Sequence, residues 1–254
     1  MSLPTPYSLV GQTALVTGGG TGIGLATAQC LADCGARVIV AGRREPELAA
    51  AVKSIGANAS YQVLNVADTA SHPGLAQKLR EQHGPVGILI NNAGINLKKP
   101  FAETTDAELL SVLQTNVVGA NALTHALLPQ LIESGRGSVV FISSMAALFG
   151  LPRVTAYSIS KSALTGAMRS LAVELGGQNI RVNAVAPGWI ETEMTRKAFA
   201  NDPARKQKIL DRTPLGLMGE PADIGWAVAY LCSPAAKFVT GTILTVDGGA
   251  SIGF

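Results

Sequence analysis

The sequence has little of several features that mark other classes of protein. No apolar run among its 254 residues approaches the roughly 20 residues that a membrane-spanning helix needs. The net charge is only +3 and is spread along the chain, too small to indicate a nucleic-acid or membrane-surface partner. The first twelve residues lack the basic and apolar regions of a signal peptide. We therefore expect a soluble, cytoplasmic protein that binds neither nucleic acid nor membranes.

Cysteine and histidine are also scarce, with three of each. The cysteines show no paired spacing of a disulfide framework. Cys30 and Cys34 are four residues apart on an expected helix, so they are either two ligands of a metal or small apolar residues packed against a sheet. Because no neighbouring His or Asp completes a metal site, we favour packing and expect no metal. We expect surface or packing roles for His72, His83 and His125.

What the sequence does contain is a regular alternation of short apolar runs and longer helical stretches. The runs are rich in Val, Ile and Leu without alternating polar residues, which is typical of strands buried on both faces. This alternation predicts an α/β fold, a doubly wound parallel sheet of about seven strands with helices on both faces. No low-complexity linker or block of like charges divides the sequence, and it has no internal repeat of 20–50 residues. We therefore expect a single domain over residues 1–254. The expected strands are Thr13–Thr17, Arg37–Ala41, Tyr61–Asn65, Gly87–Ile90, Ser138–Ile142, Arg181–Val185 and Ile243–Val246, and the clearest helices are Ile23–Cys34, Ala107–Leu131 and Ala156–Leu175.

The segment Glu191–Pro221 interrupts this alternation. It is polar and charged, contains Asp202-Pro203 and Thr213-Pro214, and connects a strand to the next helix. An insertion of this length at the C-terminal end of a strand can close over a site, or it can be an exposed helical excursion. We expect residues 191–221 to be a substrate lid, and the second interpretation stays open.

A glycine-rich turn follows the first expected strand and leads directly into a helix. Residues 18–24 are Gly-Gly-Gly-Thr-Gly-Ile-Gly. Glycine lets the backbone approach a pyrophosphate closely, and a helix N-terminus offers free N–H groups and the positive end of a dipole. At this position the turn indicates a dinucleotide site, and it lacks the Lys-Ser/Thr of a triphosphate loop. We expect the cofactor to contact Gly18, Thr21, Gly22, Ile23 and Gly24.

The end of the second expected strand bears on which dinucleotide binds. An NAD site usually has an acidic residue there, whereas this chain has Arg43 and Arg44 and no carboxylate before Glu45. A guanidinium can form paired bonds with a 2′-phosphate, which a carboxylate would repel. We therefore predict NADP(H) in preference to NAD(H), with Arg43 as the leading contact and Arg44 as the second. Either arginine could instead be a solvated loop residue.

Polar residues follow the fourth, fifth and sixth expected strands, at the edge where the sites of open α/β sheets lie. The segments are 91–94 (Asn-Asn-Ala-Gly), then Ser144, then 187–192 (Pro-Gly-Trp-Ile-Glu-Thr). Tyr157 and Lys161 are one turn apart on the helix after Ser144, so their side chains share a face. A nearby ammonium favours the phenolate and lowers the pKa of a phenol toward the range of a proton donor. The pattern predicts a proton-transfer site at Tyr157.

Together these motifs resemble those of the short-chain dehydrogenase/reductase family, over essentially the whole chain. Residues 17–24 look like its cofactor loop, residues 91–94 like its sheet-supporting motif and residues 246–249 like its C-terminal signature. The resemblance implies a Rossmann-type domain and hydride transfer between nicotinamide C4 and a carbonyl carbon. At Asn65 the family often has Asp instead. Besides the glycine turn and the arginines, the implied cofactor contacts are Asn65, Val66, Asn92, Ala93, Gly94, Tyr157, Lys161, Pro187, Gly188, Ile190 and Thr192.

The resemblance also implies four catalytic residues, Ser144, Tyr157, Lys161 and Asn116. Tyr157 would give or take the proton on oxygen, and Ser144 would hold and polarise that oxygen. Lys161 would bond the nicotinamide ribose and tune Tyr157. Asn116 would anchor a water through a locally distorted helix. A homotetramer is implied as well, with the two long helices around Asn116 and Tyr157 forming one interface.

The substrate is less clearly indicated than the reaction, beyond a small carbonyl or secondary alcohol. Lys98, Lys99 and Arg153 could attract an acidic substrate such as a keto-sugar acid, or they could be solvated loop charges. Residues 99–103 and 152–154 look similar to those of keto-gluconate reductases, but 3-oxoacyl-carrier-protein reductases share almost the same motifs. A regulatory protein that binds NADPH without turnover is a third candidate; it would be expected to lack part of the Ser-Tyr-Lys set.

Overall fold

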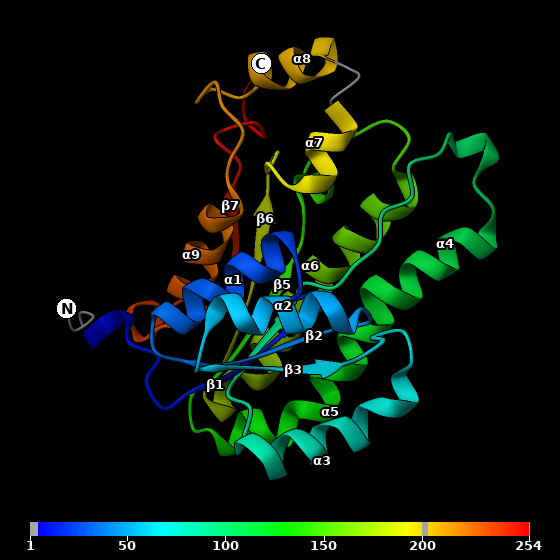
Figure 1. Cartoon of the computed structure of the whole chain (residues 1–254). Helices are drawn as coiled ribbons and strands as arrows, with labels where there is room; N and C mark the ends of the chain where they lie inside the picture. The colour runs from blue at the N-terminus through cyan, green and yellow to red at the C-terminus, as the bar shows by residue number, and fades with distance from the viewer. Residues whose placement is uncertain (1–4, 200–202, 254) are drawn as a thin grey trace.

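A parallel seven-stranded sheet forms the centre of the molecule (Figure 1). The computed structural model describes residues 5–199 and 203–253. The strand order is β3-β2-β1-β4-β5-β6-β7, and each neighbouring pair is parallel. The predicted doubly wound sheet is thus confirmed. The strands are β1 (Thr13–Thr17), β2 (Arg37–Gly42), β3 (Ala59–Val63), β4 (Ile88–Asn91), β5 (Gly137–Ile142), β6 (Ile180–Pro187) and β7 (Ile243–Val246).

Helices cover both faces of the sheet and bury a separate apolar cluster on each. One cluster joins α1, α2 and α9 to the strands, and the other joins α3, α5 and α6 to them. The helices are α1 (Gly22–Asp33), α2 (Glu45–Ile55), α3 (His72–His83), α4 (Asp106–Leu113), α5 (Gly119–Glu133), α6 (Thr155–Leu175), α7 (Glu193–Phe199), α8 (Pro203–Arg212) and α9 (Pro221–Cys232). Short 3-10 turns cover Thr5–Tyr7, Thr69–Ser71, Phe101–Glu103, Met145–Ala147, Gly176–Gln178 and Pro234–Ala236. Within residues 5–199 and 203–253, no helix has both the length and the apolar character needed to cross a bilayer.

The third strand begins and ends two residues earlier than the sequence predicts. β3 is an edge strand whose side chains are exposed or half-buried, so burial does not mark its ends. Leu64 still bonds β2 through its N–H and the carbonyl of Gly42 (2.7 Å). The chain then turns at Asn65, whose Oδ1 accepts from the N–H of Ala67 (3.2 Å).

The predicted helix Ala107–Leu131 is continuous but contains a π turn at Gln114–Val118, between α4 and α5. Directly after this turn, a Cβ on Gly119 would collide with the carbonyl oxygen of Val66. Gly119 therefore lets the helix lie against the loop that follows β3. The π turn also places Asn116 in the local distortion that the family resemblance implies.

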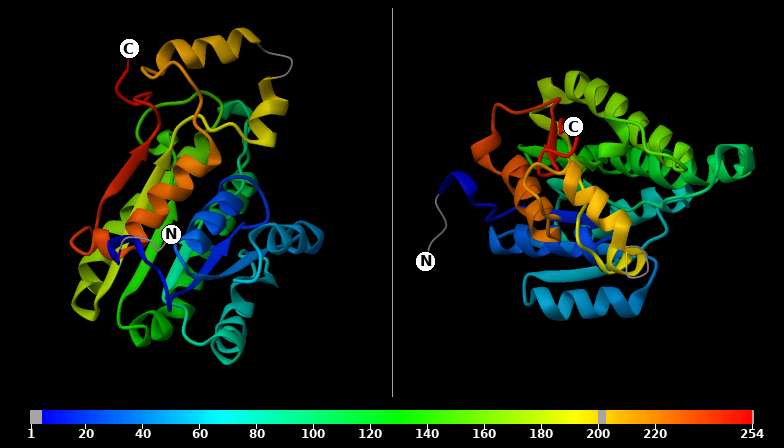
Figure 2. Two further views of the ribbon diagram at one scale, coloured as in Figure 1. Left: turned by 60° about the vertical axis from the view of Figure 1, so that its left-hand side comes forward. Right: turned by 90° about the horizontal axis from the view of Figure 1, so that it is seen from above.

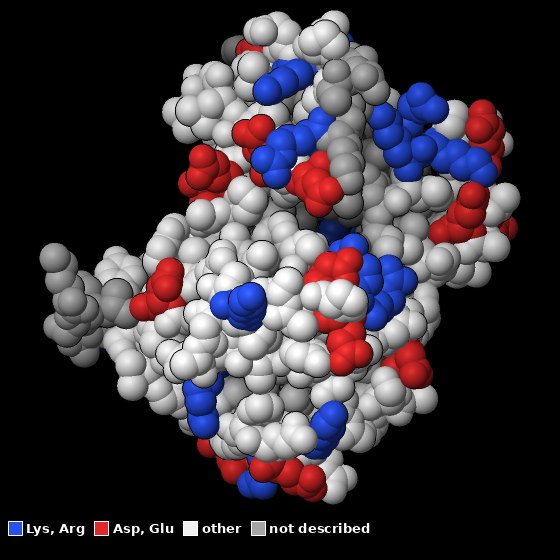
Figure 3. All heavy atoms as spheres, viewed as in Figure 1, with Lys and Arg blue, Asp and Glu red and all other residues white. Residues whose placement is uncertain are grey.

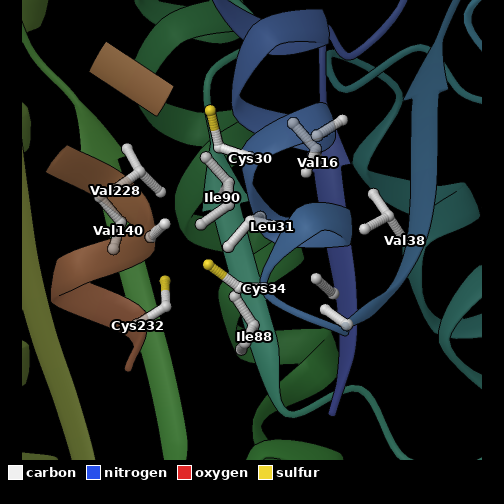
Figure 4. Close-up of a cluster of buried hydrophobic side chains, with 14 of the residues drawn as sticks. Val16, Cys30, Leu31, Cys34, Val38, Ile88, Ile90, Val140, Val228 and Cys232 are labelled. Carbon is white, nitrogen blue, oxygen red and sulfur yellow. The ribbon is translucent and has the colours of Figure 1, made fainter. Parts of the chain in front are cut away.

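The three cysteines lie in the apolar cluster beneath α1 and α9 (Figure 4). Cys30 lies in α1, Cys34 is the C-cap residue of α1 and Cys232 ends α9, and all three are buried free thiols. Burial raises the pKa of both Cys30 and Cys232 to about 12, which disfavours the thiolate that a metal would need. A Cβ on Gly225 would come within 2.6 Å of Cys30 Sγ, so the two helices pack closely there. The packing interpretation of Cys30 and Cys34 is confirmed.

The segment between β6 and α9 forms α7 and α8, which stand beyond the C-terminal ends of the strands (Figure 2). The ring of Phe199, at the end of α7, packs edge-on against Trp189, with the ring centroids 6.3 Å apart. Residues 200–202 of the expected lid lie outside the described residues. The helical segment is thus positioned above the edge of the sheet where the predicted site residues lie.

Candidate active site

The glycine turn is tied to β4 by the side chains of Thr17 and Asn92. Thr17 Oγ1 accepts from the N–H groups of Asn92 and Ala93 (3.0 Å each) and donates to the carbonyl of Ile90 (3.1 Å). Asn92 Nδ2 donates to the carbonyls of Thr17 (2.8 Å) and Gly18 (3.2 Å). Asn92 therefore supports the turn from below, which agrees with a sheet-supporting motif. Thr17, which the sequence places in the cofactor-loop motif but not among the expected contacts, thus supports the turn.

Close backbone packing explains the glycines of this turn. Gly18 has φ +64°, and a Cβ there would lie 2.8 Å from Asn92 Nδ2. A Cβ on Gly24 would collide with the carbonyl oxygen of Gly18. Thr21 is the N-cap residue of α1 but makes no side-chain capping bond. The first N–H groups of α1 thus remain available to an anion such as a pyrophosphate.

Arg43 and Arg44 are both exposed, but they differ in their partners. Arg44 Nη1 forms an ion pair with Glu47 Oε1 at 2.9 Å. Among the residues that the structure describes, Arg43 has no hydrogen-bonded or charged side-chain partner. Arg43 follows β2 directly, so its guanidinium is the freer of the two to bind a phosphate at this edge.

Asn65 and Val66 lie on the other side of this edge, after β3. The Asn65 Oδ1 that accepts from Ala67 retains a second lone pair, so an adenine N–H can still bind there. Val66 is buried and packs against the start of α5 through its carbonyl, opposite Gly119. The two residues are placed as the prediction requires, and their contact with a cofactor stays a prediction.

Tyr157 and Lys161 lie on one face of α6, with Lys161 Nζ 5.5 Å from the centroid of the Tyr157 ring. Lys161 is buried, its Nζ donates to the carbonyl of Ile142 (2.7 Å), and burial lowers its pKa to about 8. Burial raises the pKa of Tyr157, and the nearby Ser144 hydroxyl lowers it to a smaller extent. The expected lowering of the Tyr157 pKa by Lys161 is therefore not observed, because the ammonium lies beside the ring and bonds Ile142 instead of the phenol.

Ser144 begins the loop that leads from β5 to α6. Its hydroxyl accepts from the N–H of Ala146 (3.1 Å) and influences the phenol of Tyr157. The neighbouring Ser143 is buried and donates instead to the carbonyl of Lys161 (3.2 Å). The structure thus brings Ser144, Tyr157 and Lys161 together and gives Ser143 a packing role.

Asn116 is buried in the π turn and faces both the loop after β4 and the start of α6. Its Oδ1 accepts from the N–H of Ile95 (2.8 Å), and its Nδ2 donates to the carbonyl of Ile95 (2.9 Å) and to Ser160 Oγ (2.9 Å). A Cβ on Gly94 would lie 3.2 Å from Asn116 Oδ1 and 3.6 Å from Lys161 Nζ. The amide therefore lies near Lys161. Ser160 also belongs to the site, and the sequence analysis did not name it. Its position directly before Lys161 was the signal that could have indicated it.

The motif after β6 lies beside the glycine turn and is held by β7 and the residues that follow it. The N–H of Gly188 donates to the carbonyl of Val246 (2.9 Å), and a Cβ on Gly188 would come within 2.5 Å of Asp247. Pro187 ends β6, and Ile190 is buried. Thr192 Cγ2 lies 3.8 Å from the position of a Cβ on Gly22. The structure thus brings residues 187–192 next to the glycine turn. The two segments must lie together in this way if they hold the same dinucleotide.

The three cations expected near the substrate lie on adjacent loops. The N–H of Lys99 donates to the carbonyl of Arg153 (2.8 Å), which joins the loop after β4 to the loop before α6. Lys99 Nζ pairs with Glu108 Oε1 at 3.0 Å, so much of its charge is neutralised. Lys98 and Arg153 are exposed. Figure 3 shows Lys and Arg side chains beside the hollow that lies below α7 and α8.

The family model described as enoyl-(acyl carrier protein) reductase matches residues 18–251, nearly the whole chain. The matched range includes the glycine turn, Asn116, Ser144, Tyr157 and Lys161. The chain belongs to the short-chain dehydrogenase/reductase family. It is thus an oxidoreductase of the class that interconverts CH–OH and C=O groups with a nicotinamide cofactor.

The relatives of this chain within the family are named for different substrates. A tropinone reductase homolog of Arabidopsis thaliana is 40% identical over 250 residues, 97% of this chain and 77% of that protein. A 3-oxoacyl-[acyl-carrier-protein] reductase of Escherichia coli is 38% identical over 239 residues, 94% of this chain and 97% of that protein. A gluconate 5-dehydrogenase of Burkholderia cenocepacia, solved with NADP and tartrate, superposes with a TM-score of 0.93 at 30% identity, covering 98% of this chain and 99% of that one.

Proposed function

We propose that this chain is an NADP(H)-dependent enzyme in which Tyr157 exchanges a proton with the oxygen of a small carbonyl or secondary alcohol. The observation that carries the proposal is the convergence of Ser144, Tyr157 and Lys161 beside a glycine turn that Thr17 and Asn92 hold in place. A protein that only binds NADPH would not need this set. The cofactor, when bound, supplies or accepts the hydride.

The surroundings of Tyr157 favour the role of proton donor in carbonyl reduction. Because burial raises the pKa of the phenol, Tyr157 stays protonated at neutral pH and can give its proton to a developing alkoxide. Ser144 lies beside the phenol and can donate a hydrogen bond to the same substrate oxygen. Lys161 Nζ lies beside the Tyr157 ring, and its proposed role is to bond the nicotinamide ribose when the cofactor is bound. Asn116 holds the Ile95 backbone and Ser160, and would thereby position the start of α6 and a bound water.

Arg43 supports NADP(H) as the preferred cofactor over NAD(H). It is exposed at the end of β2 and has no charged partner among the described residues, so a 2′-phosphate can take both of its Nη groups. NADP is named in the Burkholderia gluconate 5-dehydrogenase complex, which supports the same preference. Arg44, paired with Glu47, is proposed as the weaker contact.

A keto-sugar acid such as a keto-gluconate is our proposed substrate class. Support comes from exposed Lys98 and Arg153 on adjoining loops and from the likeness to a gluconate 5-dehydrogenase. The likeness to a 3-oxoacyl-[acyl-carrier-protein] reductase makes that activity the alternative. Residues 191–221 are proposed to be the substrate lid, because α7 and α8 stand above the site.

A homotetramer is also proposed, with α5 and α6 at one interface. Exposed apolar side chains on or beside these helices support it, namely Val118, Ile159 and Val173, of which Val173 is 86% exposed. A cytoplasmic location stays a prediction.

The test is a substrate panel followed at the absorbance of NADPH, in both directions. Keto-gluconates, neutral keto-sugars, bicyclic ketones and 3-oxoacyl thioesters are compared by kcat/KM, each with NADPH and NADH. Highest kcat/KM for a keto-gluconate with NADPH would support the proposal. A preference for acyl thioesters would establish the alternative, and absence of turnover with every class would contradict the enzymatic proposal.

A further inference from the structure

Arg212, the last residue of α8, touches two other segments that flank the candidate site. Its guanidinium carbon lies 4.4 Å from the centroid of the Phe149 ring, and its Nε donates to the carbonyl of Ala250 (3.1 Å). Its own carbonyl lies so close to Gly253 that a Cβ there would come within 2.6 Å. One residue thus joins the end of α8, the loop after Ser144 and the C-terminal segment.

Phe149 belongs to the loop that also fixes Ser144. The Ser144 hydroxyl accepts from the N–H of Ala146 (3.1 Å), and the N–H of Phe149 donates to the carbonyl of Met145 (3.1 Å). An open surface pocket of about 410 Å³ lies along this loop and the start of α6, lined by residues 146–151 with Thr155 and Ser158.

The C-terminal segment is in turn anchored to the motif after β6. Gly188 packs directly against Asp247, whose carboxylate accepts from the N–H groups of Gly249 (2.9 Å) and Ser251 (2.8 Å). The N–H of Leu215, which follows Arg212 closely in sequence, donates to the carbonyl of Gly248 (3.2 Å). Arg212 and Leu215 therefore connect the end of the α7–α8 segment to the loop after Ser144 and to the C-terminal segment.

We infer that Arg212 is a positioning residue that sets the substrate side of the site. It holds the Ser144–Leu151 loop against residues 248–253 and so fixes the wall that a carbonyl substrate meets. An arginine suits this task because its planar guanidinium can stack on a ring while an N–H in its plane donates to a carbonyl. A lysine ammonium can lie over the ring but has no Nε at the same place. The inference rests on the proposed roles of Ser144 and Tyr157.

The first experiment compares Arg212→Ala, Arg212→Lys and Phe149→Leu with Lys53→Ala, which removes an exposed cation of α2 far from this contact. With the panel compound that gives the highest kcat/KM as substrate, loss of the stacking contact is expected to raise the substrate KM about 5- to 10-fold, with kcat and the KM for NADPH changed less than about 2-fold. Arg212→Lys should recover part of the loss, and Lys53→Ala should resemble the wild type. A substrate KM for Arg212→Ala within about 2-fold of the wild type would overturn the inference.

A double variant tests whether the two residues act through one contact. If they do, Arg212→Ala combined with Phe149→Leu has a substrate KM no higher than the larger of the two single effects. Effects that multiply would show two independent roles and overturn the inference.

Hydrogen exchange separates this inference from the proposed reaction because it requires no turnover. In Arg212→Ala, the amides of residues 145–151 and 248–253 should exchange faster than in the wild type, while those of β1 and β4 do not change. Faster exchange in both segments would support the contact even if none of the carbonyl compounds were reduced. Unchanged exchange would contradict it even in an active enzyme.

Discussion

The side-chain amide of Asn116 donates to the hydroxyl of Ser160 over 2.9 Å, and that hydroxyl donates to the carbonyl of Tyr157 over 2.7 Å. Ser160 is fully buried and directly precedes Lys161. One hydroxyl therefore joins the π turn to the first turns of α6, where Tyr157 and Lys161 lie. The position of Tyr157 relative to Asn116 depends on this connection.

Replacing Ser160 by Ala should destabilise the protein and disturb the site. The variant leaves Asn116 Nδ2 with the Ile95 carbonyl alone, and losing a partner of a buried polar group costs about 1–3 kcal/mol of unfolding free energy. Urea unfolding measures this cost, and kcat should fall as well because Tyr157 is less well positioned. Ser162→Ala, an exposed neighbour on the same helix, is the matched control. Equal unfolding free energies for the two variants would contradict the prediction.

Tyr157→Phe should abolish most turnover while the cofactor still binds. Removing a positioned proton donor typically costs about 10²- to 10⁴-fold in rate, and the ring itself is retained to pack beside Lys161. Steady-state NADPH oxidation measures the rate, and quenching or enhancement of NADPH fluorescence measures the Kd. Tyr61→Phe, on the edge strand, controls for loss of a phenol hydroxyl elsewhere. Substantial activity in Tyr157→Phe would assign the proton to another group.

Much of the fold could be predicted from the sequence because the sheet is parallel and mostly buried. β1 has the predicted ends, since continuous apolar residues mark a strand covered on both faces. β7 lies at a sheet edge and is only partly buried, but its apolar residues still mark its ends. β3, at the opposite edge, was misplaced by two residues because its partly exposed sequence contains Ser60 and Gln62 and does not mark its ends. Hydrophobic periodicity also did not indicate the π turn at Gln114–Val118, which depends on one extra residue in a single turn.

The candidate site could be predicted from motifs that lie close together in the sequence and have few other uses. Contacts between residues that are distant in sequence could not be predicted in this way. The glycine turn and the Tyr157–Lys161 spacing were recognised from residue types and spacing alone, and the chemistry assigned to them stays a prediction. The pairing of Lys99 with Glu108 joins a loop to α4 and could not be inferred from either motif. The direction of the Tyr157 pKa was wrong because it depends on burial and on where Lys161 Nζ points, neither of which the spacing shows.

Lys161 should make stability depend on pH in a predictable direction. Burial lowers its pKa in the folded protein from 10.5 to about 8, so the unfolded chain binds more protons between these values. Stability therefore rises with pH through this window, and the cost of the buried ammonium is present below it. Relative to Lys161→Met, the wild type should gain about 2 kcal/mol between pH 7 and pH 9.5.

Urea unfolding of both proteins without cofactor, at half-unit pH steps, measures this difference. The upper limit of pH 9.5 lies below the usual pKa of tyrosine, so ionisation of Tyr157 in the unfolded chain contributes little. Because both proteins contain the same cysteines, the effect of their raised pKa values cancels in the comparison. A constant difference across the range would show that Lys161 keeps an ordinary pKa in the folded protein.

Arg43 and Arg44 should contribute unequally to the choice of cofactor. Arg43 has no charged partner in the described part of the chain, whereas Arg44 already pairs with Glu47 at 2.9 Å. Arg43→Ala should raise the KM for NADPH about 10- to 100-fold, the value of charge-assisted bonds to a phosphate, and leave the KM for NADH nearly unchanged. Arg44→Ala should raise the KM for NADPH less than about 3-fold, because the guanidinium of Arg44 is already paired with Glu47 and contributes little to binding the phosphate.

Initial rates with NADPH and with NADH give the KM of each variant for each cofactor. An equal rise in the KM for NADPH in both variants would show that the Arg44–Glu47 pair opens to bind the phosphate. If Arg43→Ala raised the KM for NADPH and for NADH equally, Arg43 would lie away from the 2′-position.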